Sequence, residues 1–144
     1  MKILFLHGLE SGPNGSKVKH LTEKGYDVYA PKLPKESFHD SVRIAQDMFD
    51  EVEPDCVVGS SRGGAIAMAI DSRQAKLILI APAWKKYNVP AQLSSGATIL
   101  HSADDDVIPL GESCVLAAQL YICGSSHRMS DKSALDTLCS VLKV

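Results

Sequence analysis

The sequence contains little that would direct the chain to a membrane, a nucleic acid or an oxidising compartment. Its 15 Lys and Arg residues nearly balance 17 Asp and Glu residues, for a net charge of −2, and they form no basic run. Nucleic-acid binding is therefore not expected. No apolar stretch approaches the roughly 18 residues of a membrane span, and the run at residues 2–6 is too short for a signal-peptide core. The 4 cysteines are scattered without a C-x-x-C pair, so we expect free thiols in a reducing cytoplasm.

Short apolar runs alternate with segments of helical spacing along all 144 residues, which we expect to form a single domain. Runs that are apolar throughout and separated by helices are typical of parallel strands covered on both faces. The pattern predicts an α/β fold, a three-layer αβα sandwich around a mainly parallel six-stranded sheet. The expected strands are residues 2–6, 27–30, 56–58, 76–80, 97–101 and 120–123. The expected helices are residues 16–24, 38–52, 62–71, 109–119 and 131–142, with Ser16 and Ser37 as caps of the first two.

Residues 57–64 contain the pattern G-x-S-x-G with Ser61 at its centre. An apolar strand precedes it and a small-residue helix follows, as in a nucleophile elbow, where the serine occupies a strained turn above the sheet edge. The positions two before and two after the serine must be nearly free of side chain, and Gly59 and Gly63 meet this requirement. Centring the pattern on Ser60 would place bulky residues there. Ser61 is therefore the candidate nucleophile, although an ordinary glycine-rich turn has the same pattern.

Two further reactive groups follow strands of the predicted sheet. Three consecutive aspartates come after the fifth strand and His127 comes after the sixth. Since sites in parallel sheets form beyond the carboxyl ends of strands, these groups are expected near Ser61, in the order Ser, Asp, His found in α/β-hydrolases. A neutral imidazole can take the proton of an attacking serine, and a carboxylate behind it fixes the tautomer. The pattern predicts a catalytic triad.

The acidic turn offers three candidates for the triad acid. The common turn D-x-x-[VI]-P selects Asp105, four residues before Pro109, and leaves Asp104 as the alternative. Asp106 is expected to be solvated or to support the N-terminus of the following helix.

Backbone amides are expected to supply the oxyanion hole. The N–H of Arg62 follows the nucleophile directly, and that of Leu9 follows the first strand. His7 and His101 end the first and fifth strands and are expected to support loops through hydrogen bonds. The chain lacks a local ligand pair such as H-x₃-H, so no metal site is expected.

Four segments carry a resemblance to a known family. They are residues 6–8 together with 11–13 and 16–17, then residues 58–64, 103–108 and 124–129. Through them the chain resembles the α/β-hydrolase superfamily, and within it the small bacterial YqiA/YcfP-type esterases. The resemblance implies a minimal α/β-hydrolase fold without a lid domain, with Ser61, Asp105 and His127 as the triad. It also implies hydrolysis of small carboxylic esters or thioesters through an acyl-enzyme on Ser61, without a cofactor.

Two features of the sequence concern the substrate site. Arg62 stands where these enzymes often carry an apolar residue, which suggests a positive group facing the site and a preference for anionic substrates. Residues 82–96, where larger relatives insert a lid, form a short segment carrying Trp84 and Tyr87. We expect a shallow, open site for small acyl groups, walled partly by these aromatic residues, whose alternative role is packing of the loop onto the core.

Two other functions stay open at this point. The scaffold could serve a non-catalytic binding or interaction protein, and the same residues would also allow an acyltransferase. A His127 ring turned away from Ser61 beside a filled pocket would favour the binding protein.

Overall fold

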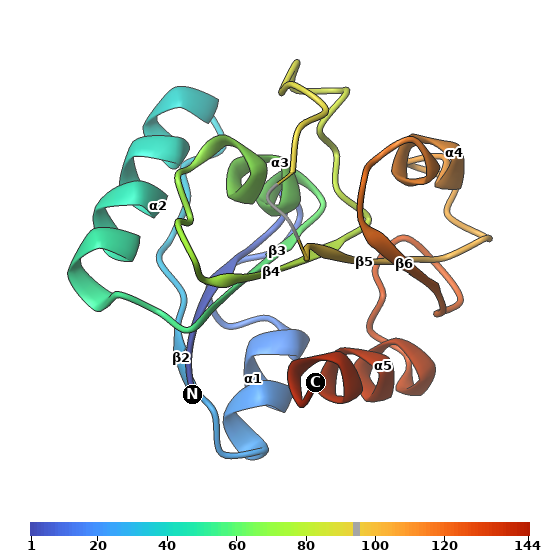
Figure 1. Cartoon of the computed structure of the whole chain (residues 1–144), viewed down its shortest axis with the longest axis horizontal. Coiled ribbons are helices and arrows are strands. Elements are labelled where there is room, and N and C mark those ends of the chain that lie inside the picture. Colours follow the sequence, from blue (N-terminus) through green and yellow to red (C-terminus); the bar gives the residue numbers. More distant parts are fainter. Residues whose placement is uncertain (94–95) are drawn as a thin grey trace.

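In the computed structural model, which describes residues 1–93 and 96–144, six strands form one sheet (Figure 1). They are β1 (Lys2–Leu6), β2 (Asp27–Tyr29), β3 (Cys56–Ser60), β4 (Lys76–Ile80), β5 (Thr98–His101) and β6 (Gln119–Ile122). Their order across the sheet is β2-β1-β3-β4-β5-β6, and every neighbouring pair is parallel. The predicted αβα sandwich with a six-stranded sheet is confirmed.

Helices cover both faces of the sheet (Figure 1). In the described residues they are α1 (Ser16–Glu23), α2 (Phe38–Val52), α3 (Arg62–Ala69), α4 (Leu110–Cys114) and α5 (Lys132–Leu142). Alternate residues of β1 enter two different cores, because successive strand side chains point to opposite faces. Ile3 packs with residues of α1 and α5, whereas Leu4 packs with residues of α2 and α3. Burial on both faces explains why the strands read as continuous apolar runs.

The helix ends differ from the prediction in two places. Ser37 caps α2 as expected, accepting a hydrogen bond from the Asp40 amide over 3.0 Å. Ser16 does not cap α1, because it is already the first helical residue. Gly15 occupies the cap position, and its carbonyl accepts from the Lys19 amide. The helix predicted over 109–119 is also wrong beyond residue 114. The chain must turn there to reach Gln119, which opens β6 and pairs with β5, so strand pairing overrides local helical spacing.

The connection between β4 and β5 is short, as predicted. Its described parts, residues 81–93 and 96–97, contain turns but neither helix nor strand, in keeping with a fold without a lid domain. Residues 94 and 95 of the predicted loop lie outside the described residues. Among the residues that are described, no helix combines the length and apolar character needed to cross a membrane.

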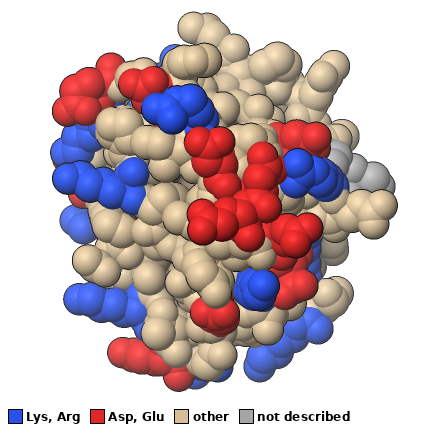
Figure 2. Space-filling view, turned by 90° about the vertical axis from the view of Figure 1, so that its left-hand side faces the viewer, with Lys and Arg blue, Asp and Glu red and all other residues tan. Residues whose placement is uncertain are grey.

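Acidic side chains gather on the side of the molecule where α2 lies (Figure 2). The exposed acidic residues of this helix are Asp40, Asp47, Asp50 and Glu51. Arg43 lies 3.9 Å from both Asp40 and Asp47, and Arg73 lies 2.7 Å from Asp50. These arginines neutralise part of the negative charge of this solvent-exposed face. Exposed ion pairs of this kind contribute little to stability.

Candidate active site

Ser61 occupies a strained turn between β3 and α3. Its φ of 56° and ψ of −114° lie in a region that residues with a side chain rarely adopt, at a cost of about 1–3 kcal/mol. The end of β4 holds this turn in place. The Ser61 amide donates to the Ile80 carbonyl over 2.8 Å, and the Ser61 carbonyl accepts from the Ala83 amide over 3.0 Å. The serine side chain is thus lifted from the carboxyl edge of the sheet, as in a nucleophile elbow.

The corner closes only because two positions lack side chains. A Cβ atom on Gly63 would lie 1.9 Å from the Leu6 carbonyl oxygen, and one on Gly59 would lie 2.4 Å from the Gly63 carbonyl oxygen. Both contacts involve backbone atoms that cannot move aside without shifting a strand or the helix. The prediction that these positions must be free of side chain is confirmed.

The structure brings Ser61, His127 and Asp105 together in one series of hydrogen bonds. Ser61 Oγ lies 2.8 Å from His127 Nε2, and His127 Nδ1 lies 2.7 Å from Asp105 Oδ2. The histidine comes from the loop after β6 and the aspartate from the loop after β5. Since an ionised carboxylate only accepts, the imidazole proton lies on Nδ1, and Nε2 is left to accept from the serine hydroxyl. The arrangement can move a proton away from Ser61.

The side chain of Asp105 is fully buried, at 0% exposure. Its Oδ1 accepts hydrogen bonds from the amides of Val107 and Ile108, over 2.8 and 2.7 Å. Burial by itself would raise the pKa of this carboxyl, but the hydrogen bonds from His127 and the two amides outweigh it and lower the pKa below its usual value. Asp104, the alternative acid, and Asp106 are both exposed. Asp105 is therefore the aspartate in contact with the histidine.

Leu9 and Arg62 both line the cavity beside Ser61. Leu9 follows β1, and Arg62 is the first residue of α3, where an amide has no acceptor within its own helix. Neither amide donates a backbone hydrogen bond within the parts of the chain that the structure describes. Both are available to a developing negative charge.

The Arg62 side chain does not face the site, so the expectation of a positive group from this residue beside the substrate is wrong. The residue is 2% exposed, and its Nη2 donates to the Pro34 carbonyl over 2.9 Å and to Ser41 Oγ over 3.2 Å. Its guanidinium carbon lies 5.7 Å from the ring centroids of both Phe38 and Tyr87. These contacts hold the positive charge behind the elbow, where it anchors the segment before α2.

A cavity of about 650 Å³ opens beside Ser61 and His127. This volume lies within the usual range of ligand pockets. The expectation of a shallow, open site for small acyl groups stays a prediction. Its apolar wall includes Phe5, Leu9, Ala83, Tyr87, Val107 and Ile108. Besides Arg62, its charged residues are Glu10, Lys17, Lys86, Asp106 and Arg128. Tyr87 lines the cavity, but Trp84 does not. Trp84 instead donates from Nε1 to the Glu112 carbonyl over 3.0 Å and packs against the core, which is the alternative role considered for it.

Lys17 ties the start of α1 to the loop that carries His127. Its ammonium donates to the Arg128 carbonyl over 2.6 Å. Burial, followed by the nearby charge of Arg128, lowers the pKa of Lys17 to about 8. The sequence did not indicate a role for this lysine. The only hint was its position in one of the four segments that carry the family resemblance.

His7 and His101 support loops, as expected. His7 donates from Nδ1 to the Gly8 carbonyl and accepts from the Leu33 amide at Nε2, over 2.8 and 3.0 Å. His101 contacts the Ile108 carbonyl over 2.8 Å. Among the described residues, no group of three or more His, Cys, Asp or Glu side chains is arranged to hold a metal ion.

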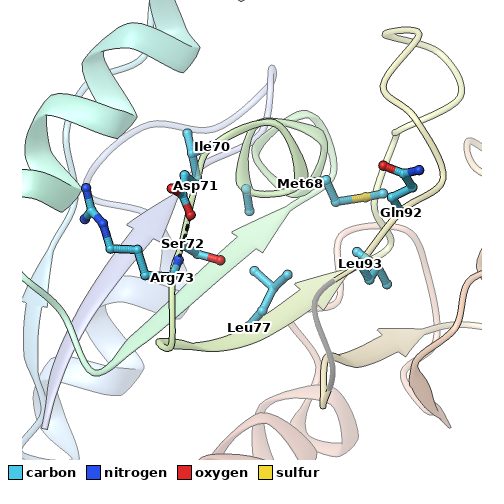
Figure 3. A pocket seen from close by; sticks show the side chains of 9 residues that line it. Met68, Ile70, Asp71, Ser72, Arg73, Leu77, Gln92 and Leu93 are labelled. Atoms are coloured by element: carbon cyan, nitrogen blue, oxygen red, sulfur yellow. Dashed lines mark hydrogen bonds between the residues drawn. The ribbon is translucent and has the colours of Figure 1, made fainter.

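A second, smaller hollow of about 130 Å³ lies at the opposite end of α3 (Figure 3). Met68, Leu77 and Leu93 form part of its wall. Its charged groups serve the local fold, because Asp71 accepts from the Arg73 amide and the Arg73 side chain pairs with Asp50. None of the described residues that line the hollow is a nucleophile with an adjacent base, so the cavity at Ser61 is the candidate active site.

Comparisons with known proteins agree with this architecture. No family model and no curated protein sequence matches the chain. Among solved structures, Est1E from Butyrivibrio proteoclasticus matches with a TM-score of 0.77 and 15% identity over 99% of this chain and 85% of that chain. Alpha/beta hydrolase domain-containing protein 10 from mouse matches with a TM-score of 0.74 and 17% identity over 99% and 88%. MGS-MChE2, an alpha/beta hydrolase enzyme from a lagoon-sediment metagenome, matches with a TM-score of 0.74 and 19% identity over 99% and 89%.

These structural matches identify the fold. The chain has the fold of the α/β-hydrolase superfamily. The finer resemblance to the YqiA/YcfP-type esterases stays a prediction.

Proposed function

We propose that the protein is a serine hydrolase that cleaves small carboxylic esters or thioesters through an acyl-enzyme on Ser61. The observation that best supports the proposal is the hydrogen-bonded series from Ser61 through His127 to Asp105, at 2.8 and 2.7 Å. The strained turn at Ser61 and the open cavity beside it agree with this role. The names of the structural neighbours, which include hydrolases and an esterase, point the same way.

In the proposed reaction, Ser61 Oγ attacks the acyl carbon while His127 Nε2 takes the hydroxyl proton. The amides of Leu9 and Arg62 stabilise the resulting oxyanion, and loss of one such donor typically costs about 10²–10³ in rate. The alcohol or thiol leaves with the proton from His127, and the acyl group stays on Ser61. Water then loses a proton to His127 and attacks the acyl-enzyme, which releases the carboxylic acid and restores the serine. Asp105 keeps the imidazole in the required tautomer throughout.

The cavity favours an acyl group of modest size that packs against apolar side chains. Side chains of Phe5, Val107 and Ile108 give it an apolar wall, and its volume is about 650 Å³. The proposed partner is therefore a small-molecule acyl ester or thioester. The 4 cysteines are free, which supports the proposal of a reducing, cytoplasmic location.

Hydrolysis of p-nitrophenyl acetate, followed by a panel of esters and thioesters of graded chain length, tests the proposal. Wild-type protein should hydrolyse the short substrates, and Ser61→Ala should abolish the activity. Ser60→Ala is the matched control, because it removes the neighbouring hydroxyl and leaves the triad intact. Equal activity in wild type and Ser61→Ala would refute the proposal.

The alternatives differ in what they predict for the same assay. A binding protein would show no hydrolysis, and the contact between His127 and Ser61 argues against it. An acyltransferase would form the acyl-enzyme but pass the acyl group to an added alcohol or amine faster than to water. Product analysis with such an acceptor separates these two outcomes.

A further inference from the structure

His101 makes a second contact with the carboxylate of Asp105. Its Nε2 lies 3.2 Å from Oδ2, the same oxygen that accepts the hydrogen bond from His127. The side chains of His101 and Asp105 are both fully buried, at 0% exposure. Two imidazoles therefore meet at one carboxylate oxygen, one beside Ser61 and the other behind the acid.

The surroundings of His101 determine which nitrogen carries its proton. Nε2 lies 2.8 Å from the Ile108 carbonyl as well as close to Asp105, and both of these oxygens only accept. Nε2 must therefore carry a proton. Nδ1 lies 2.6 Å from Ser113 Oγ on α4, whose hydroxyl can donate to it. A ring protonated at Nε2 donates to the Ile108 carbonyl and accepts from Ser113 at Nδ1, and its Nε2 lies 3.2 Å from the Asp105 carboxylate.

The backbone of Ile108 links His101 to Asp105. Its amide donates to Oδ1 of Asp105 over 2.7 Å, while its carbonyl accepts from His101. His101 thus acts on Asp105 directly, through the nearby N–H dipole, and indirectly, through the residue that anchors the other carboxylate oxygen. His101 is not among the described residues that line the cavity, so it does not reach the substrate.

We propose that His101 is a positioning residue for the triad, holding the Asp105 carboxylate in line with His127. The inference rests on the proposed hydrolase function. Ser113 is the residue that orients His101 for this task. An apolar side chain at 101 would fill the space but leave the Ile108 carbonyl and the Ser113 hydroxyl without a partner, and the carboxylate would lose a neighbouring N–H.

His101→Phe and His101→Gln separate positioning from packing. His101→Phe should lower kcat for p-nitrophenyl acetate on the order of 10- to 10²-fold with KM nearly unchanged, because misplaced catalytic groups slow the chemical step. His101→Gln, whose amide N–H can replace Nε2–H, should recover most of the loss. Phe49→Leu, a core substitution on α2 at a residue that does not line the cavity, controls for lowered stability and should leave kcat unchanged.

The Nδ1 proton of His127, observed by proton NMR, provides a readout that does not need activity. A hydrogen bond to the buried carboxylate should move this resonance far downfield in wild type. The resonance should shift or disappear in His101→Phe and return in His101→Gln. Ser113→Ala should show a smaller change in the same direction, and it serves as the test if His101→Phe does not fold.

The two proposals fail in different ways. Wild-type protein with the downfield resonance but no activity on any ester or thioester would refute the hydrolase function and leave the positioning role measurable by NMR. Active wild type, together with a His101→Phe variant of unchanged kcat and unchanged resonance, would overturn the positioning role. Equal losses in His101→Phe and His101→Gln would overturn it as well, since packing alone would then explain them.

Discussion

His127 donates a hydrogen bond from Nδ1 to Oδ2 of Asp105 over 2.7 Å, across 22 residues of the chain. The carboxylate is buried on its other side and held by two backbone amides. The imidazole therefore presents an unprotonated Nε2 to Ser61. The proposed chemistry depends on this contact, because the opposite tautomer could not accept the serine proton.

Asp105→Asn should lower kcat for ester hydrolysis by about 10⁴-fold, because an amide in this position can impose the wrong tautomer on His127. Asp104→Asn is the matched control, since Asp104 is exposed one residue away, and its kcat should stay within about twofold of wild type. Steady-state kinetics on both variants measure the difference. A large loss in Asp104→Asn and a small one in Asp105→Asn would reverse the assignment of the acid.

Asp105 should also make folding stability depend on pH. Its pKa is lower in the folded protein than the value of about 3.9 expected for an unfolded chain. The ionised carboxylate therefore stabilises the fold above that unfolded-state pKa, and the contribution is lost as the pH falls through the lower folded-state pKa. Urea unfolding between pH 6 and pH 2 should show the free-energy gap between wild type and Asp105→Asn shrinking toward acid. A gap that widens toward acid would contradict the lowered pKa of Asp105 in the folded protein.

Gly63→Ala should prevent the elbow from closing. The added methyl would meet the Leu6 carbonyl at 1.9 Å, so we expect a loss of at least about 3 kcal/mol in the free energy of unfolding, or no folded protein. Gly12→Ala is the control, because nothing lies within 4 Å of its added methyl. Thermal and urea unfolding should place that variant between wild type and about 1 kcal/mol more stable. A stable, active Gly63→Ala variant would show that the corner is looser than described.

Ser37→Ala should cost about 1 kcal/mol, because the Ser37 hydroxyl caps α2 through the Asp40 amide. Ser16→Ala should change stability by less than about 0.5 kcal/mol, since no side chain caps α1. The two variants therefore compare the same Ser→Ala substitution at a helix start where the serine side chain caps the helix and at one where it does not. Equal losses in the two variants would contradict the cap geometry.

The parts of the molecule that could be predicted are those set by local pattern. Continuous apolar runs identified the strands, because both faces of β1 and its neighbours are covered. Gly59 and Gly63 marked the elbow because a strand and a helix can meet so closely only without side chains. Ser61, Asp105 and His127 could be predicted to lie close together, because the carboxyl ends of parallel strands meet at one edge.

The parts that could not be predicted depend on contacts between distant segments. Arg62 follows the nucleophile in sequence, but its direction is set by Pro34, Phe38 and Tyr87, which no local pattern reveals. Trp84 turns toward the Glu112 carbonyl on α4 for the same kind of reason. The short α4 likewise reflects the pairing of β6 with β5.

Labelling with a fluorophosphonate, followed by mass spectrometry of the modified peptide, tests the central claim most directly. The probe reacts with a serine only where an adjacent base and oxyanion donors activate it. We predict one phosphonylated residue, Ser61, with labelling lost in Ser61→Ala and strongly slowed in Asp105→Asn. Folded wild-type protein that stays unlabelled, or that is labelled at another residue, would contradict the account.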